Sequence, residues 1–381
     1  MFKGFYFERA ELAKRLADEL TGEVPFSDAP NGLFLAAPRR TGKSVFIKDE
    51  LGPELERRGI VVIYVDLWEY KDKPPATLVS AKIADAMRDL VSKVLGNVKT
   101  LEFMGFKIEL GKIGTKDGLS FYKALDLLRK KKKQPVALMI DEAQHALTDA
   151  EGENMMSALK SARDQMREKG KPGLLLVMTG SHRDKLSYLL NTTSAPFWGS
   201  EIRTLPTLGD EFALFLSREI KKMRHDLLSI RDDNMIKAFR HFGERPQLLL
   251  DQIARILPEV GDAEDFDKKL LQAARKRKEK DREEYTKVFL MLGKTEQAVL
   301  WQMLDKGKEF RPFAKDALEQ YSGYTAKKVS ALQAQRALEN LQNQDPPLVW
   351  KTTRGDYSLY DLTMAEWYEY LANADQWPPQ N

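Results

Sequence analysis

The stretch LFLAAPRRTGKSVFIKD, residues 33–49, decides the fold that this sequence predicts. Its first residues form an apolar run typical of a buried strand, and the residues after Lys43 have the pattern of a helix. Gly42, Lys43 and Ser44 therefore stand where the predicted helix begins. Backbone N–H groups at such a turn, together with the positive end of the helix dipole, form a binding site for phosphate.

This loop departs from the usual phosphate-loop pattern at its first glycine position, which is occupied by Ala37. Ala37 lies where the loop leaves the strand, so we expect its methyl group to stay clear of the phosphates. We assign close backbone approach to Gly42, contact with the β- and γ-phosphates to Lys43, and Mg²⁺ binding to the Ser44 hydroxyl. The alternative is a chance loop that contains GKS. The predicted binding set is Ala37, Pro38, Arg39, Arg40, Thr41, Gly42, Lys43, Ser44 and Val45.

A second element of chemistry follows another apolar strand, in VALMIDEAQH (136–145). We predict that Asp141 holds Mg²⁺ through its water shell and that Glu142 polarises the attacking water. In the alternative interpretation, this acidic pair ends a strand and caps a helix. The pair lies about 100 residues after the loop, a combination that favours nucleotide hydrolysis.

The next strand candidate ends in VMTGSHRD (177–184). Thr179 or Ser181 would position the attacking water from this neighbouring strand. For His182 and Arg183, a role at this site and a place as solvated loop residues both stay open.

Composition limits the remaining classes of protein. The chain has 381 residues, 43% hydrophobic and 31% charged, which predicts two or three domains in a soluble protein. It contains no cysteine, which excludes disulfides and thiolate metal sites and is typical of a cytoplasmic protein, and its four histidines have no metal-ligand spacing. Its apolar runs are too short to span a membrane, and the first residues do not have the pattern of a secretory leader. A net charge of +4 means that nucleic-acid contact must come from local patches.

The order of predicted elements indicates several domains. Residues 1–206 alternate strand and helix patterns, which predicts an α/β core with a short inserted hairpin at 100–112. The strand signals stop after that core. The predicted domains are the core (1–206), a helical lid (207–260), a charged connector (261–292) and a winged helix-turn-helix (293–381). The expected strands of the core are 32–37, 59–68, 135–141, 174–180 and 201–206.

Taken together, these motifs resemble the AAA+ and STAND superfamily of P-loop ATPases over most of the chain. FERAELAKRLADEL (7–20) is similar to the family's N-terminal GREEEL box beside the adenine, and DEAQ (141–144) to its metal and base motif. LLLVMTGS (174–181) resembles the sensor strand, and APFWGSEIRTLPTL (195–208) resembles a further family segment. FGERPQLLL (242–250) resembles the glycine–proline motif of the lid.

The resemblance implies a P-loop ASCE-type parallel sheet, a small helical lid and a C-terminal winged helix. It implies an oligomeric, Mg-dependent ATPase that converts ATP to ADP and phosphate. ATP rather than GTP rests on this resemblance, because no guanine-reading motif is evident. By the same resemblance, Arg245 would contact the γ-phosphate in cis.

The arginine finger of the family is missing from its usual place. GSEIR (199–203) has Ser200 and Glu201 there, so the nearest candidate is Arg203, with Arg183 behind it. Such a finger stabilises transition-state charge from a neighbouring subunit. The alternative is that Arg203 is an ordinary polar residue at a strand end.

The predicted winged domain supplies a candidate surface for duplex DNA. We predict a recognition helix at 325–342 with Thr325 as its N-cap. Val329, Leu332, Leu338 and Leu341 would face inward, and Lys327, Lys328, Gln333, Gln335 and Arg336 would face the DNA. Lys351 and Arg354 would contact the backbone from a wing that turns at Arg354, Gly355 and Asp356.

The charge of the same domain argues the other way. Residues 295–381 hold nine Lys/Arg and twelve Asp/Glu, whereas phosphate neutralisation supplies most non-specific DNA affinity. Two basic tracts, 128–135 and 274–282, would supply the positive charge for DNA contact that this domain lacks. In the alternative interpretation, the first tract is a solvated helix end and the second is a charged helix face. Two functions therefore stay open. One is a DNA-associated motor, loader or regulator, and the other is a STAND-type switch, regulatory or in defence, whose winged helix contacts protein.

Overall fold

The computed structural model describes residues 6–37, 40–69, 73–89, 100–103, 106–181, 183–191, 195–344, 347–351, 357–360 and 363–379. The chain divides into two compact units. Unit 1 comprises Met1–Leu228 with Glu244–Asp251, and unit 2 comprises Ser229–Gly243 with Gln252–Asn381. The predicted lid, 207–260, is thus divided between the units, and the bounds of the four predicted domains stay predictions.

Unit 1 is built on a five-stranded parallel sheet, which confirms the predicted α/β class. Its strands are β1 (Leu33–Ala36), β2 (Val61–Asp66), β5 (Val136–Asp141), β6 (Leu174–Gly180) and β7 (Ile202–Thr204). The strand order is β2-β5-β6-β1-β7. Strand β6 therefore lies between the strand that leads into the loop and the strand that ends in the acidic pair. Because all the strands are parallel, their carboxyl ends share one edge of the sheet.

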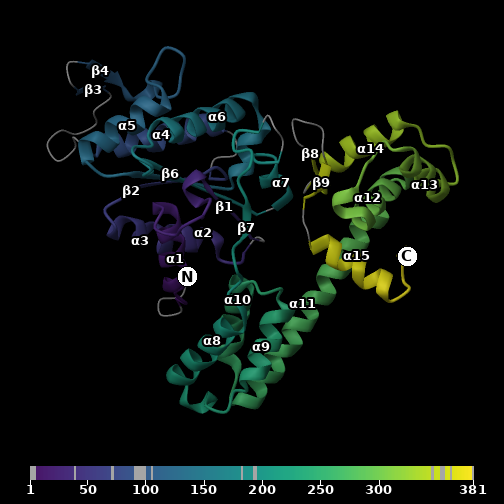
Figure 1. Ribbon diagram of the computed structural model, residues 1–381. Coiled ribbons are helices and arrows are strands. Elements are labelled where there is room, and N and C mark those ends of the chain that lie inside the picture. The colour runs from purple at the N-terminus through teal and green to yellow at the C-terminus, as the bar shows by residue number, and fades with distance from the viewer. Residues whose placement is uncertain are drawn as a thin grey trace. The chain divides into compact units, whose positions relative to one another are not determined.

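Helices cover both faces of this sheet (Figure 1). On one face lie α4 (Pro75–Arg88), α5 (Phe121–Lys132) and α6 (Ala150–Gln165). The other face carries α1 (Ala10–Thr21) and a continuous helical run of α2 (Lys43–Phe46), the π-helical turn η2 (Ile47–Leu51) and α3 (Gly52–Arg57). Successive residues of β1 face opposite sides of the sheet. Phe34 packs in the apolar cluster with α4, α5 and α6, and Leu35 packs in the apolar cluster with α1, α2 and α3. Burial on both faces explains why the strands are continuous apolar runs.

The remaining elements of unit 1 follow the same core. The predicted insertion is a hairpin, as expected, of β3 (Thr100–Phe103) and β4 (Phe106–Glu109). Two further helices are α7 (Arg183–Ser187) and α8 (Gly209–Met223). Unit 1 also has the short 3-10 turns η1 (Ala29–Asn31), η3 (Leu110–Lys112), η4 (Ala143–Thr148) and η5 (His225–Leu227). The 3-10 turns η6 (Leu257–Glu259) and η7 (Gly307–Glu309) belong to unit 2.

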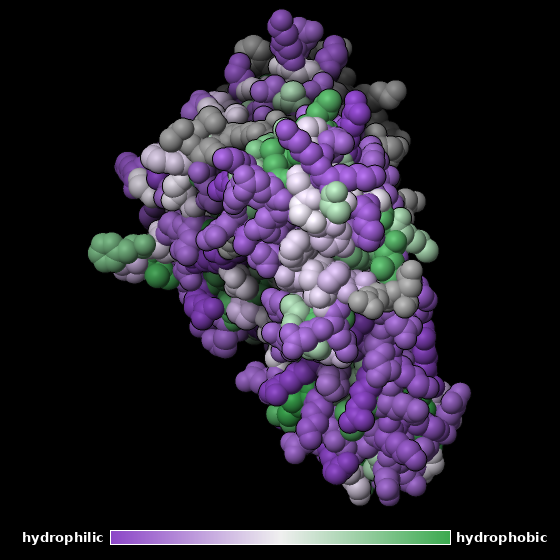
Figure 2. All heavy atoms as spheres, turned by 90° about the vertical axis from the view of Figure 1, so that its right-hand side faces the viewer, coloured by the Kyte–Doolittle hydropathy of each residue, from purple (hydrophilic) through white to green (hydrophobic). Residues whose placement is uncertain are grey.

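Unit 2 contains α9 (Asp232–His241), the later part of α10 (Pro246–Ile256) and the long helix α11 (Ala263–Met291). The predicted charged connector is therefore one helix of 29 residues. It begins at an N-cap, because the Asp262 carboxylate accepts a hydrogen bond from the backbone of Asp265 at 2.8 Å. Figure 2 shows one face of the molecule, on which hydrophilic side chains predominate and apolar ones are scattered.

The C-terminal part of unit 2 has the predicted order of three helices and a two-stranded antiparallel sheet. These are α12 (Lys294–Lys306), α13 (Lys315–Thr325), α14 (Ala331–Gln342), β8 (Val349–Lys351) and β9 (Tyr357–Leu359), followed by α15 (Thr363–Asn373). The predicted turn at Arg354, Gly355 and Asp356 lies outside the described residues. No helix in the described ranges has both the length and the apolar character that crossing a bilayer requires.

The predicted start of the third helix was wrong. Thr325 ends α13, where its hydroxyl donates to the Tyr321 carbonyl at 2.8 Å, and Ser330 is the N-cap of α14. Ser330 and Gln333 form a capping box, in which each side chain bonds to the backbone of the other. The predicted inward position of Leu332 was also wrong, because this side chain is 57% exposed.

Candidate active site

The loop after β1 joins the sheet to a helix as predicted. The backbone N–H of Ala37 donates to the Gly180 carbonyl at 3.2 Å, which ties the end of β1 to the end of β6. Gly42 has φ of 87°, a left-handed conformation that glycine adopts without strain, and α2 begins at Lys43. Thr41 is buried and Arg40 is exposed, while Pro38 and Arg39 lie outside the described residues. Ser44 is exposed and Val45 half-buried on the first turn of the helix.

Lys43 is a buried cation at the centre of the site. It is 5% exposed, and its Nζ donates to Asp141, to Glu142 Oε1 at 2.9 Å and to Thr179 Oγ1 at 3.3 Å. Burial acts to lower the pKa of Lys43, but the carboxylates of Asp141 and Glu142 outweigh this effect and raise the pKa above its ordinary value. The structure thus brings together four predicted residues from three parts of the chain.

Asp141, at the end of β5, is held by donors from both neighbouring strands. The Thr179 hydroxyl donates to Oδ1 from β6, and the Tyr64 hydroxyl donates to Oδ2 from β2 at 3.2 Å. Burial and the nearby Asp141 carboxylate raise the pKa of Tyr64. Sequence analysis missed Tyr64, although a polar aromatic residue in the strand that pairs with β5 was a usable signal.

Glu142 follows Asp141 in a left-handed conformation, with φ of 54°. Its Oε2 accepts hydrogen bonds from the Ser181 hydroxyl at 2.8 Å, from the Ser181 backbone N–H at 3.2 Å and from the Gln144 amide. Burial alone would raise the pKa of Glu142, but the Lys43 charge and these hydrogen bonds lower it to about 2. The carboxylate is therefore ionised and fixed in orientation.

The two alternatives for positioning water thus have separate contacts. Thr179 bonds to Asp141 and Lys43, whereas Ser181 bonds to Glu142. Gln144, which sequence analysis left without a role, packs close to Gly180. A Cβ atom at Gly180 would lie 2.6 Å from Gln144 Oε1, so a glycine is needed there for Gln144 to reach Glu142.

A second group that sequence analysis missed supports the loop from behind. Arg9 donates through Nη2 to the Gly42 carbonyl at 3.1 Å and pairs with Glu50 on the π-helical turn at 3.4 Å. Its guanidinium lies 4.5 Å from the centroid of the Phe46 ring. Burial lowers the pKa of Arg9 and raises the pKa of Glu50. The group thus links the N-terminal segment to the backbone of the loop.

The candidate arginines lie elsewhere. Arg203, on β7, forms ion pairs with Glu19 and Asp28, and its side chain is 24% exposed. The structure thus places Arg203 in a group with two acids of its own chain and not among the side chains around Lys43. Arg183 begins α7 and its Nη1 donates to Thr204 Oγ1 at 3.3 Å. A finger role for either arginine stays a prediction.

Arg245 directly precedes α10, where its carbonyl accepts hydrogen bonds from the backbone of Leu248 at 3.1 Å and of Leu249 at 3.3 Å. The segment 242–250, which resembles the glycine–proline motif of the lid, thus leads into a helix. Its contact with a γ-phosphate stays a prediction.

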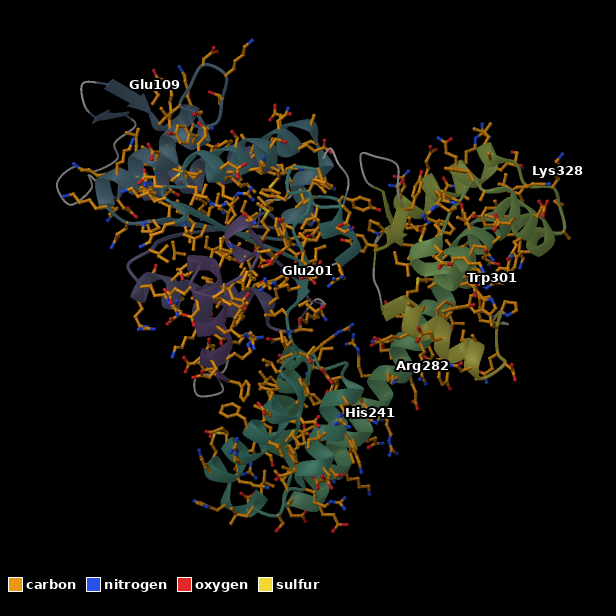
Figure 3. All side chains as sticks on the ribbon, in the orientation of Figure 1. Glu109, Glu201, His241, Arg282, Trp301 and Lys328 are labelled. Carbon is orange, nitrogen blue, oxygen red and sulfur yellow. The ribbon has the colours of Figure 1, made fainter. Side chains whose placement is uncertain are left out.

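Three of the predicted DNA-contacting cations, Lys327, Lys328 and Arg336, are exposed, while Arg354 lies outside the described residues. Lys327 and Lys328 lie in the turn before α14, and Arg336 lies on α14 itself. Figure 3 shows that Lys328 points away from the neighbouring helices. Gln333 and Gln335 are less available than predicted, because Gln333 belongs to the capping box and Gln335 donates to Glu339 at 3.0 Å.

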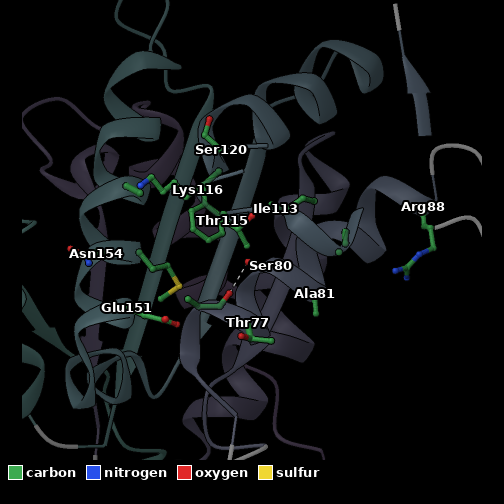
Figure 4. A pocket seen from close by; sticks show the side chains of 17 residues that line it. Thr77, Ser80, Ala81, Arg88, Ile113, Thr115, Lys116, Ser120, Glu151 and Asn154 are labelled. Atoms are coloured by element: carbon green, nitrogen blue, oxygen red, sulfur yellow. Dashed lines mark hydrogen bonds between the residues drawn. The ribbon is translucent and has the colours of Figure 1, made fainter. Parts of the chain in front are cut away.

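A pocket of about 850 Å³ lies away from this site (Figure 4). It is lined by residues of α4 such as Thr77 and Ser80, by Glu151 and Asn154 of α6, and by the segment 111–121. None of the predicted site residues lines it. In the described ranges no three His, Asp or Glu side chains gather as a metal site. The candidate chemistry therefore lies at the carboxyl edge of the sheet.

Comparisons with known proteins identify solved structures of similar fold. The sequence matches no family model and no curated protein. Among solved structures, the ADP form of the Aeropyrum pernix ORC2 protein has a TM-score of 0.56 at 12% identity, covering 99% of this chain and 98% of that one. Its ADPNP–ADP complexes give a TM-score of 0.52 at 13% identity, covering 98% and 96%. At these identities the likeness shows the fold alone, over nearly the whole chain.

Proposed function

We propose that this chain, which has the fold of the AAA+ P-loop ATPases, binds ATP with Mg²⁺ and hydrolyses it to ADP and phosphate. The observation that carries the proposal is the position of Lys43. This lysine starts the helix after the loop and reaches Asp141, Glu142 and Thr179 at the carboxyl edge of the sheet. A buried cation beside a phosphate-binding turn and two carboxylates fits phosphoryl chemistry.

Lys43 and the loop backbone bind the phosphates in this proposal. Phosphate oxygens offer Lys43 a negative partner of greater charge than either carboxylate, and the N–H groups around Gly42 add hydrogen bonds without charge. The two solved structures of similar fold, an ADP form and ADPNP–ADP complexes, support a nucleotide as the ligand. The Arg9 contact with the Gly42 carbonyl holds this part of the loop in place.

The donor set of Ser44 and Asp141 fits Mg²⁺. A hydroxyl and a carboxylate are hard oxygen ligands, and Mg²⁺ sites in such enzymes use one or two protein ligands together with phosphates and water. When bound, the ion neutralises charge that develops on the phosphates. The Thr179 and Tyr64 hydroxyls hold the Asp141 carboxylate in one orientation.

Glu142 orients the attacking water. Its pKa of about 2 depends on the charge of Lys43, so a shift of that charge toward phosphate raises the pKa of Glu142 and makes it a stronger proton acceptor. The Ser181 and Gln144 bonds hold Oε2, which leaves Oε1, now bonded to Lys43, to face the water. The proton acceptor is thus activated when the phosphates engage Lys43.

Binding and turnover of Lys43→Ala and Glu142→Gln test the proposal. We expect Lys43→Ala to lose ATP binding, and Glu142→Gln to bind ATP with a turnover at least about 100-fold lower. Glu56→Gln, which removes an exposed carboxylate on α3, is the matched control and should keep wild-type turnover. Normal turnover by Glu142→Gln would show that the base is another residue.

We propose further that the protein acts on duplex DNA as an oligomer. Support comes from the three helices and two-stranded sheet at the C-terminus, and from the exposed Lys327, Lys328 and Arg336. The net-acidic charge of residues 295–381 favours instead a switch whose winged domain contacts protein. Charge reversal of the three cations to Glu separates the two functions. Lost duplex binding supports DNA association, and unchanged affinity together with DNA-indifferent turnover supports the switch.

A further inference from the structure

Three cations form a stripe on one side of α11, beside the end of α9. Arg275, Lys278 and Arg282 are spaced three and four residues apart, so they follow one face of the helix. His241, the last residue of α9, lies close enough to Lys278 and Arg275 that their charges, after burial, lower its pKa. Figure 3 labels His241, at the end of α9, and Arg282, on α11. We call Arg275, Lys278 and Arg282 the α11 stripe.

Two other cations of the same helix are neutralised by acids one turn away, whereas part of the stripe is not. Arg277 pairs with Asp281 at 2.9 Å, and Lys269 pairs with Asp265 at 2.9 Å. Arg275 and Lys278 are exposed and have no ion-pair partner among the described residues. Cations gathered on one face repel each other, and an external anion relieves that repulsion.

Arg282 has a fixed position at the end of the stripe. Its guanidinium stacks on the ring of Tyr370 on α15, 3.3 Å from the centroid. A stacked guanidinium keeps its charge and its hydrogen-bond donors, and it loses less side-chain entropy when it binds an anion. The C-terminal helix thus orients one member of the stripe.

We infer that the α11 stripe binds the phosphate backbone of duplex DNA. The inference rests on the proposed DNA association and names a second contact surface for it. Arg275 and Arg282 are about 10 Å apart along the helix axis. A duplex presents a phosphate about every 3.4 Å along each strand, so the stripe matches roughly three consecutive phosphates.

The stripe supplies what the winged domain lacks. Residues 295–381 are net acidic, but α11 leads directly into that domain and belongs to the same unit. Sequence-independent affinity for DNA comes from neutralised phosphates, whereas base readout comes from groove contacts. The stripe therefore contributes affinity, and the residues around α14 contribute orientation and readout.

A pair of matched double variants on the same helix tests the inference. Arg275→Gln with Lys278→Gln removes two charges from the stripe, and Lys276→Gln with Lys280→Gln removes two exposed charges from another face. Duplex affinity is measured by fluorescence anisotropy at several salt concentrations, after thermal melting shows that each variant is folded. We expect the stripe variant to bind about tenfold more weakly or worse, with a salt slope smaller by about 1.8.

The outcomes separate this inference from the function on which it rests. The control variant should keep the wild-type slope, and equal slopes for both double variants would overturn the stripe. Suppose that wild type binds the duplex, that charge reversal of Lys327, Lys328 and Arg336 abolishes binding, and that the stripe variant binds normally. The inference about the stripe is then wrong, while the proposed DNA association stands. A wild type that binds no duplex overturns both. Binding of polyglutamate as tight as that of the duplex would indicate an acidic protein partner, and would also overturn the inference.

Discussion

The positive charge of Lys43 and the negative charges of Asp141 and Glu142 compensate one another inside the protein. The ionisation of each side chain therefore depends on the other two. A buried charge is tolerated when it is paired and hydrogen-bonded, and this group has both kinds of partner. Removing one member therefore changes the ionisation of the rest as well as the chemistry of the site. The same reasoning applies to Arg9 and Glu50 behind the loop.

The lowered pKa of Glu142 predicts how stability depends on pH. Its ordinary pKa of 4.5 applies to the unfolded chain, and its folded value is about 2. The ionised carboxylate therefore stabilises the fold above about pH 4.5, and this contribution is lost as the pH falls toward 2. Between about pH 6 and about pH 3.5, we expect wild type to lose roughly 1 kcal/mol more of its free energy of unfolding than Glu142→Gln.

Urea unfolding at both pH values measures this difference. The Glu56→Gln variant controls for the loss of a carboxylate, because Glu56 is exposed. A gap between wild type and Glu142→Gln that stays constant with pH would contradict the lowered pKa.

Arg9 is predicted to contribute to stability and to nucleotide affinity by separate contacts. Arg9→Met leaves Glu50 buried without its cation, which should lower the free energy of unfolding by about 3 kcal/mol. Arg9→Met combined with Glu50→Leu should recover most of that loss, because the buried charge is then absent. Affinity for ATP should stay weakened in both variants, since neither restores the bond to the Gly42 carbonyl.

Denaturant unfolding and equilibrium ATP binding check this pair of variants. If the double variant regains wild-type ATP affinity, the Gly42 contact has no part in holding the loop. Arg57→Met, which removes an exposed arginine on α3, is the control and should change neither property much.

At the level of single elements, α14 shows how neighbouring residues compete to start a helix. Both Thr325 and Ser330 are residue types that favour an N-cap. Ala326 has φ of 53°, and this left-handed residue ends α13, so the chain begins a new helix after Ser330. The separation places Lys327 and Lys328 in the turn between α13 and α14 instead of on α14.

Ser330→Ala should therefore destabilise the C-terminal region by about 1 kcal/mol, because the first turn of α14 loses its hydroxyl acceptor. Thermal unfolding and helical circular dichroism measure the loss. Thr325→Ala is the informative comparison, since it alters the end of α13. A larger effect at Thr325 than at Ser330 would mean that the helix begins where the sequence alone suggested.

For the whole molecule, strand order decides which motifs meet. Asp141 lies 98 residues after Lys43, and Thr179 lies 136 residues after it. The order β2-β5-β6-β1-β7 sets these residues side by side at one edge and adds Tyr64 from the neighbouring strand. Division into two units, with the predicted lid shared between them, is likewise a property of long-range contacts.

The sequence by itself determined the features that depend on local spacing. The strand–loop–helix around Lys43, the acidic pair at the end of β5, the inserted hairpin and the order of C-terminal elements all follow from apolar periodicity and nearby turn residues. Lys43, Asp141, Glu142 and Thr179 were named on this basis.

Only the tertiary structure decided the contacts between distant segments. Tyr64 on Asp141, Ser181 and Gln144 on Glu142, and Arg9 on the loop depend on which strands and helices are neighbours. Arg203 belongs with Glu19 and Asp28 for the same reason. Periodicity shows which face of an element is buried, but the partner on that face is set by strand pairing and helix packing across the whole unit.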